Sequence, residues 1–412
     1  MRLKVIVGVY LALFSIAAFV MMGCTTKGID YQEGLSKFED RELGEALKVF
    51  EAIAQEGGKY ANRARYYIGE CYKLQFKWDE ATKQFQMVVD AEPPTSYLAA
   101  QARNRISQIR EGRRDIERLR IIHDNNPGTE QAADSLLELG SVYENKLDDY
   151  DNAIKAYRQL IEEFPGTPKA AQAQVSIGYV YFYKLYDYTT GWEEFKKVNE
   201  ENYPELRFRV SEVEDLLRDT NKLLGEIREH QTFISMSQKR KIPEGRRVTG
   251  YEIYGARRDQ VAQSFLAVGK KWRQLKNYPR AMNAYRLLIA RLPLMLRQVA
   301  QGRYTIAEIY QSDLARYLEA IDAYEEYIKY HPTDFRRDEA IYNMAICYEA
   351  LRDYDKAYDS YKTYRDTYGD GKFYKAAELK VRQWEYDEDQ DGFPYYKELI
   401  AGTSDTDPNQ HP

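Results

Sequence analysis

The sequence predicts an all-α protein built as a solenoid of helix-turn-helix pairs. Residues that favour helices dominate the composition, and only 24 glycines and 13 prolines occur in 412 residues. A pattern of small and aromatic residues at helical spacing recurs along the chain. Prolines such as Pro93, Pro165, Pro293 and Pro332 follow several copies, at points where a helix has to end.

In each copy of the pattern, a large apolar residue precedes Gly or Ala, and an aromatic residue follows three positions after that small residue. An alanine comes next, with a second aromatic four residues later. The copies are Gly69-Tyr72-Ala81, Gly140-Tyr143-Ala153, Gly178-Tyr181, Gly269-Trp272-Ala281, Ala307-Tyr310-Ala320 and Ala345-Tyr348-Ala357. A weaker copy with Gly34, Ala46 and Phe50 stands near the N-terminus.

This pattern resembles the tetratricopeptide repeat, a helix-turn-helix unit of about 34 residues. The resemblance implies that the two helices cross at the small residues and that the aromatics fill the gap between one hairpin and the next. It also implies a concave groove, lined by the first helices, that binds extended or helical segments of partner proteins. Exposed polar and aromatic residues of those helices are the expected recognition residues.

The N-terminal segment predicts export. Arg2 and Lys4 precede an apolar run from Val5 to Met22 that is short for a membrane span. Gly23-Cys24 resembles the lipobox of bacterial lipoproteins, which implies a signal peptide at 1–23 and a lipid such as palmitate on Cys24. Thr25 stands where inner-membrane lipoproteins carry aspartate, so the expected location is the periplasmic side of the outer membrane. The alternative is an uncleaved anchor with an incidental cysteine.

Spacing between the copies predicts the domain organisation. We expect a lipid tether at 24–30, a first solenoid at 31–204, a long helix and basic loop at 205–258, and a second solenoid at 259–375. A further helix and an acidic tail occupy 376–412. Between Pro94 and Pro127 the long interval predicts an extra helical pair without the signature. Lys239 to Arg247 form the basic loop, which we interpret as solvated rather than as a binding patch.

Several kinds of chemistry are not expected. The net charge of −5 argues against non-specific binding to nucleic acid. Cys71 and Cys347 occupy the same place in two distant repeats, too far apart for a disulfide, and are expected in the core. The four histidines have no metal-ligand spacing, and no phosphate-binding loop or nucleophile motif occurs. We therefore expect neither an enzyme nor an organic cofactor.

The C-terminal tail carries a calcium-loop pattern. Residues 387–398 fit D-x-D-x-D-G-x5-E at every specified position. This pattern predicts one calcium ion held by the carboxylates of Asp387, Asp389 and Asp391, the backbone carbonyl of Phe393 and a bidentate Glu398. Tyr395 replaces the usual acid at position 9, so a water is expected there. The stretch that follows, with Asp405 and Asp407, resembles thrombospondin type 3-like and dockerin-like calcium segments. The alternative is an ordinary acidic tail.

At repeat level, residues 31–375 resemble lipoproteins of the outer-membrane β-barrel assembly machinery (BamD-like) and the Tol-Pal-associated cell-division coordinator. This resemblance implies a scaffold in envelope or outer-membrane assembly that binds envelope proteins through its groove and the membrane through its lipid. Two alternatives stay open. One is a lipoprotein subunit of a secretion or exopolysaccharide-export complex, and the other is a ligand-binding accessory lipoprotein.

Overall fold

The computed structural model describes residues 26–198, 207–239, 250–403, 405–407 and 409, and these form helices joined by short turns without any strand. The predicted all-α solenoid fold is confirmed. The chain divides into two compact units at Asp219/Thr220, inside the segment predicted to join two solenoids. Cys24, the signal segment and most of the basic loop lie outside the described residues. None of the described helices combines the length and apolarity that a bilayer crossing demands.

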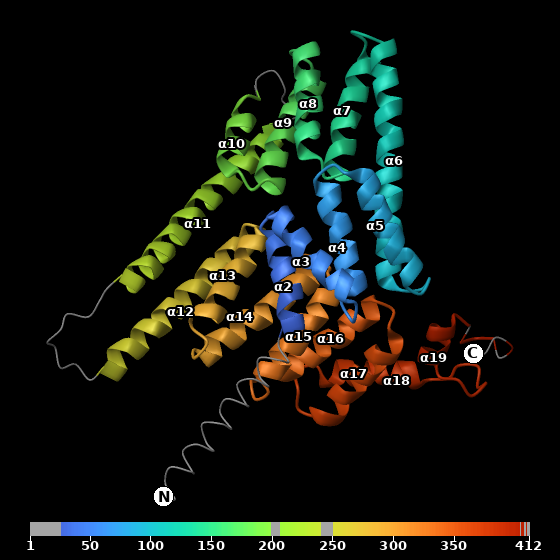
Figure 1. The fold of residues 1–412 in the computed structure, drawn as a ribbon, viewed down its shortest axis with the longest axis vertical. Coiled ribbons are helices and arrows are strands. Elements are labelled where there is room, and N and C mark those ends of the chain that lie inside the picture. Colours follow the sequence, from blue (N-terminus) through green and yellow to red (C-terminus); the bar gives the residue numbers. More distant parts are fainter. Residues whose placement is uncertain (1–25, 199–206, 240–249, 404, 408, 410–412) are drawn as a thin grey trace, which may run out of the picture. The chain divides into compact units, whose positions relative to one another are not determined.

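In the first unit, consecutive helices pack against one another as antiparallel hairpins (Figure 1). The hairpins are α2 (Thr26–Glu39) with α3 (Leu43–Glu56), α4 (Ala61–Leu74) with α5 (Trp78–Ala91), α7 (Glu130–Asn145) with α8 (Tyr150–Glu163), and α9 (Pro168–Tyr179) with α10 (Tyr188–Lys196). A π-helical turn, η1 (Val180–Lys184), extends α9. Helix α2 begins at Thr26, inside the segment expected to be the lipid tether.

Between α5 and α7 the expected helical pair is wrong. A single helix, α6 (Tyr97–Asn125), occupies the interval. Its buried face continues without interruption through Ile106, Ile109 and Ile116, so no turn separates two shorter helices. Gly112 lies near the middle of α6 without breaking it. The side chain of Leu147 packs 2.8 Å from where a Cβ of Gly112 would lie.

Helix α11 (Arg207–Lys239) crosses the boundary between the units, as a single long helix in the place where one is expected. The second unit continues with three hairpins and a terminal pair of helices. These are α12 (Gly250–Gln274) with α13 (Tyr278–Arg291), α14 (Leu296–Glu308) with α15 (Tyr317–Tyr330), α16 (Arg337–Ala350) with α17 (Tyr354–Thr367), and then α18 (Tyr374–Glu385) and α19 (Tyr395–Ala401). A second π-helical turn, η3 (Ile309–Asp313), extends α14.

One backbone hydrogen bond closes the hairpins at the signature aromatic of the first helix. The residue before the second helix donates its N–H to that aromatic residue's carbonyl, as Lys77 does to Tyr72 at 3.0 Å and Asp353 does to Tyr348 at 2.9 Å. Hairpins with one more residue keep the bond across a longer turn, as Arg316 does to Tyr310 at 2.8 Å, and η3 absorbs the extra residue there.

Each of these turns also places a residue other than glycine in the left-handed region. The φ angles lie between 51° and 62° at Arg41, Phe76, Asp148, Tyr186, Lys276, Ala315 and Arg352. Such residues are strained by about 1 kcal/mol relative to the right-handed region. The closing hydrogen bond and the packing of the following helix hold them there.

Candidate functional sites in the repeats and the C-terminal loop

The glycine of the repeat pattern makes room for an aromatic ring. A Cβ at Gly69 would lie 2.7 Å from the ring of Phe85, and one at Gly178 would lie 2.6 Å from the ring of Phe195. The rings of Tyr157 and Tyr285 lie in the same way against Gly140 and Gly269. The second aromatic of the pattern therefore fills the space inside its own hairpin, whereas the sequence suggested the gap between hairpins. The ring, not a second backbone, is what the glycine admits.

Most of the remaining signature residues are buried in the core. The alanines of the pattern are fully buried at Ala81, Ala153, Ala281, Ala307, Ala320, Ala345 and Ala357. Tyr143, Trp272 and Tyr310 are buried as well, while Tyr72, Tyr181 and Tyr348 are half-buried. Buried signature positions cannot contact a partner, which leaves the exposed and half-buried side chains of the helices for recognition of another protein.

A further position in the repeat escaped the sequence reasoning. In three hairpins whose second-helix ring is tyrosine, the hydroxyl donates to a polar side chain four residues after the small residue, whereas in the hairpin of Tyr285 this position holds Arg273. The pairs are Tyr157 with Glu144 at 3.0 Å, Tyr324 with Gln311 at 2.7 Å, and Tyr361 with Glu349 at 3.0 Å. Where the ring is phenylalanine, the same position holds Phe38, Lys73 or Phe182. The residue four positions after the small residue can be located in the sequence. The tyrosine that bonds to it lies in the second helix, so the sequence does not reveal the contact.

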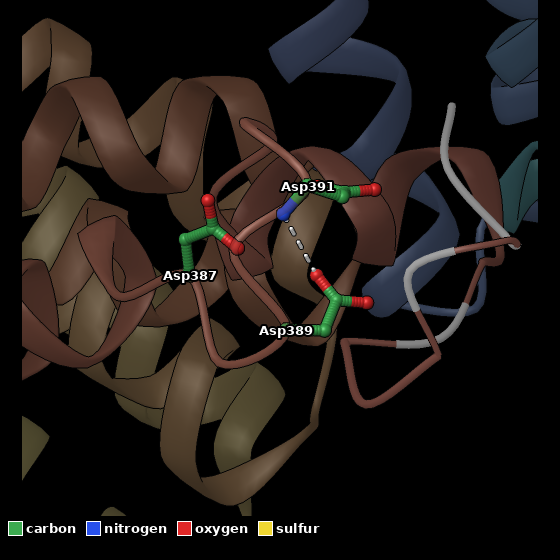
Figure 2. Close-up of side chains that lie close together, drawn as sticks. All are labelled: Asp387, Asp389 and Asp391. Carbon is green, nitrogen blue, oxygen red and sulfur yellow. Dashed lines mark hydrogen bonds between the residues drawn. The ribbon is translucent and has the colours of Figure 1, made fainter.

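The C-terminal loop brings the three predicted aspartates together (Figure 2). One oxygen each of Asp387, Asp389 and Asp391 lies within 4.8 Å of the others. Backbone N–H groups of the loop hold these side chains: Gly392 donates to Asp387 at 3.0 Å, and Asp391 donates to Asp389 at 3.3 Å. Gly392, at φ 96°, makes the sharp turn that the pattern requires. Phe393 follows it and donates its N–H to Asp391 at 2.8 Å.

Glu398 approaches this loop from helix α19. Its side chain is fully buried, and neither carboxyl oxygen has a hydrogen-bond partner in the described part of the chain. Burial, together with the nearby carboxylates of Asp405, Asp389 and Asp391, raises the pKa of Glu398 to about 7. One further oxygen of each loop aspartate, Asp387 Oδ1, Asp389 Oδ2 and Asp391 Oδ2, is likewise buried without a partner. The carboxylates at the four acidic positions of the pattern thus present unsatisfied oxygens, which a bound cation would satisfy.

The loop also positions the last helix. Tyr396 of α19 stacks on Tyr358 of α17 with ring centroids 4.2 Å apart. Lys397 pairs with Asp355 at 2.8 Å, again between α19 and α17. The acidic loop therefore connects α18 to a short helix that is docked on the preceding hairpin.

The other candidate reactive groups are structural. Cys71 and Cys347 are buried free thiols, as expected, and burial raises the pKa of each to about 12. A thiol of that kind is a poor nucleophile at neutral pH. Within the described residues, no histidine joins a group of three metal-ligating side chains.

Comparison with known proteins agrees with the repeat architecture. The tetratricopeptide-repeat family model matches residues 63–95, 134–167 and 339–371, which correspond to the hairpins α4/α5, α7/α8 and α16/α17. Three hairpins of this helical-repeat chain therefore match the tetratricopeptide repeat. Such repeats typically form scaffolds for protein–protein interaction rather than enzymes. A comparison with curated proteins gives no match.

Three solved structures are among those similar to the chain. The TPR2AB-domain:pHSP90 complex of yeast Sti1 has 16% identity, covers 79% of this chain and 98% of its own, and has a TM-score of 0.25. The C-terminal part of a TPR repeat-containing protein from Cytophaga hutchinsonii has 13% identity, 84% and 98% coverage, and a TM-score of 0.24. The P58(IPK) TPR domain has 15% identity, 86% and 97% coverage, and a TM-score of 0.23.

Proposed function

We propose that this protein is an outer-membrane lipoprotein that faces the periplasm and binds partner proteins in envelope or outer-membrane assembly. The observation that carries the proposal is the burial of the repeat signature inside successive hairpins. Because most of the small and aromatic residues of the signature are buried in the core, each unit presents its polar helix faces to another protein. The lipobox-like Gly23-Cys24 supports attachment to the membrane.

Membrane attachment is tested by metabolic labelling with palmitate in a bacterial host. The expected result is label on the wild-type chain and none on Cys24→Ser, with the variant leaving the outer-membrane fraction. Cys71→Ala is the matched control, because Cys71 is buried in α4 and this variant retains Cys24. Unlabelled wild type that still sediments with membranes would instead indicate an uncleaved anchor.

Partner binding is tested by cross-linking in intact cells, followed by purification from detergent-solubilised envelopes. Barrel-assembly proteins are the expected dominant partners. A secretion or polysaccharide-export channel in their place would favour an export subunit. Binding to isolated glycan in the absence of any protein partner would favour a ligand-binding accessory role.

A further inference from the structure

We propose that the C-terminal loop and helix α19 form a calcium-binding centre, with Asp387, Asp389, Asp391 and Glu398 as ligands and Asp405 closing the shell. This site is separate from the protein-binding faces of the repeats. It lies wholly within the second unit, where the loop after α18 meets α19.

Glu398 distinguishes this loop from an ordinary cluster of exposed acids. A fully buried carboxylate costs free energy unless a cation or hydrogen-bond donors compensate it. Both of its oxygens lack a partner within the described residues. The neighbouring cation, Lys397, pairs with Asp355 on α17 instead. Among the described residues, Glu398 is therefore buried without a cation or an N–H donor that bonds to its carboxylate.

The carboxylate donors determine which ion the site favours. All the side-chain donors are carboxylate oxygens, which hard divalent cations prefer. Calcium bonds are about 2.4 Å long, so ligands on opposite sides of the ion lie about 4.8 Å apart. The oxygens of the three aspartates fall within this separation. Magnesium needs a smaller and nearly octahedral shell, which the bidentate geometry expected of Glu398 does not favour.

Asp405 lies outside the twelve-residue loop but close to its beginning. Its Oδ1 accepts the N–H of Glu388 at 3.5 Å, so the chain after α19 returns to the beginning of the loop. Asp405 also borders the same cleft as Glu388 and Tyr395. Tyr395 occupies the loop position from which an acid or a water usually completes the shell. In the proposed site, Asp405 supplies this carboxylate.

Calcium would hold the end of the second unit together. The ion ties the loop after α18 to Glu398 on α19 and to the chain beyond it. Helix α19 is docked on α17 through Tyr396 and Lys397. Removing the ion leaves the carboxylates to repel one another, so we expect the segment after Tyr386 to open.

The test is a calorimetric titration of the detergent-solubilised full chain with CaCl2 after removal of bound metal. We expect one ion per chain, and weaker binding of MgCl2 in a parallel titration. Asp389→Asn and Glu398→Gln should each weaken binding by about 100-fold or more, and Asp405→Asn by about 10–100-fold. The amide of Asp405→Asn still accepts the N–H of Glu388, so a merely structural role would leave affinity unchanged. Asp370→Asn, an exposed acid before α18, is the matched control and should bind like wild type.

Limited proteolysis and hydrogen exchange of residues 395–403 provide a second readout that does not depend on the variants. We expect calcium to slow both in the wild-type chain and chelation to restore them. No binding at millimolar calcium would overturn the site. Protection of residues 395–403 that stays the same when chelator is added would also overturn it. Wild-type affinity in Asp405→Asn would remove Asp405 from the shell, and tighter binding of magnesium would overturn the choice of ion.

Discussion

Hairpins α4/α5 and α16/α17 are two versions of one repeat in different units. Each has its alanine twelve positions after its small residue, a buried cysteine two positions after the small residue, and a match to the tetratricopeptide-repeat model. The first packs Phe85 over Gly69, and the second packs Tyr361 into a hairpin with Ala345. The residue one turn along the first helix also differs: Lys73 in one and Glu349 in the other.

The two hairpins use this position for different contacts. The small residue leaves room for a ring, while the residue four positions later makes a different contact in each hairpin. Glu349 accepts the hydroxyl of Tyr361 at 3.0 Å. In hairpin α4/α5 the ring is Phe85, which has no hydroxyl to donate. The buried ammonium of Lys73 instead pairs with Asp148 at 2.5 Å, and this ion pair links α4 to the turn between α7 and α8. The same position thus supports its own hairpin in one unit and a neighbouring repeat in the other.

The largest expected effect comes from removing the side chain at this position. Lys73→Ala leaves Asp148 without its cation and opens a cavity, so we expect a loss of about 3 kcal/mol in unfolding free energy. Glu349→Ala should cost about 1 kcal/mol, because Glu349 is only half-buried. Urea unfolding of both variants, followed by hydrogen exchange in each unit, measures the difference. Equal losses would contradict the contrast between the two hairpins.

Exchanging the small residues should have a smaller effect. Gly69→Ala forces the ring of Phe85 to move, at about 2–3 kcal/mol, and regains about 1 kcal/mol of helix propensity. We therefore expect a net loss of about 1–2 kcal/mol by urea unfolding. Ala345→Gly should lose about 1 kcal/mol through helix propensity alone. Stabilisation by Gly69→Ala would show that the ring is not confined.

Much of this could be predicted from the sequence because it is local. Helical spacing located the repeats, and the spacing of Asp387, Asp389 and Asp391 located the acidic loop. The single helix α6 was missed because a long interval between signatures does not reveal whether a turn interrupts it. The pairing of Tyr361 with Glu349 and the approach of Asp405 to the loop depend on contacts between separate elements. Periodicity in one segment carries no record of such contacts.

Removing a single hydroxyl should have a modest effect. Tyr361→Phe takes the donor from Glu349, which keeps its ion pair with Lys380 at 2.7 Å. We expect a loss of about 0.5–1.5 kcal/mol by urea unfolding. Tyr354→Phe is the matched control in the same helix, since its ring contacts Trp384 through an edge and its hydroxyl makes no hydrogen bond within the part of the chain that the structure describes. A loss for Tyr354→Phe as large as for Tyr361→Phe would remove the special role of Glu349.

The smallest effects should be pH-dependent and of opposite sign in the two units. Burial and the nearby Arg303 lower the pKa of His331, so the second unit loses stability as pH falls below about 6.5, where the unfolded histidine takes up a proton. Hydrogen bonds to Glu163 and Asp124 raise the pKa of His123. Its contribution is complete below about 6.5 and is lost as pH rises through the folded-state pKa.

Hydrogen exchange at pH 5.5 and 7.5 resolves the two units and so measures both effects. His331→Gln should remove the acid-side loss in α15 and α16, and His123→Gln should remove the acid-side gain in α6 and α8. The same sign in α15 and α16 as in α6 and α8 would contradict these assignments.

The most direct test of the account is a double-mutant cycle between Gly69 and Phe85. If the ring lies in the space that the missing Cβ leaves, shortening it to leucine should relieve the crowding caused by Gly69→Ala. The predicted cost of Gly69→Ala with Phe85→Leu is then lower than the sum of the single costs by about 1 kcal/mol or more. Additivity within about 0.3–0.5 kcal/mol would mean that the two positions do not share this space, and would contradict the packing rule on which the repeats depend.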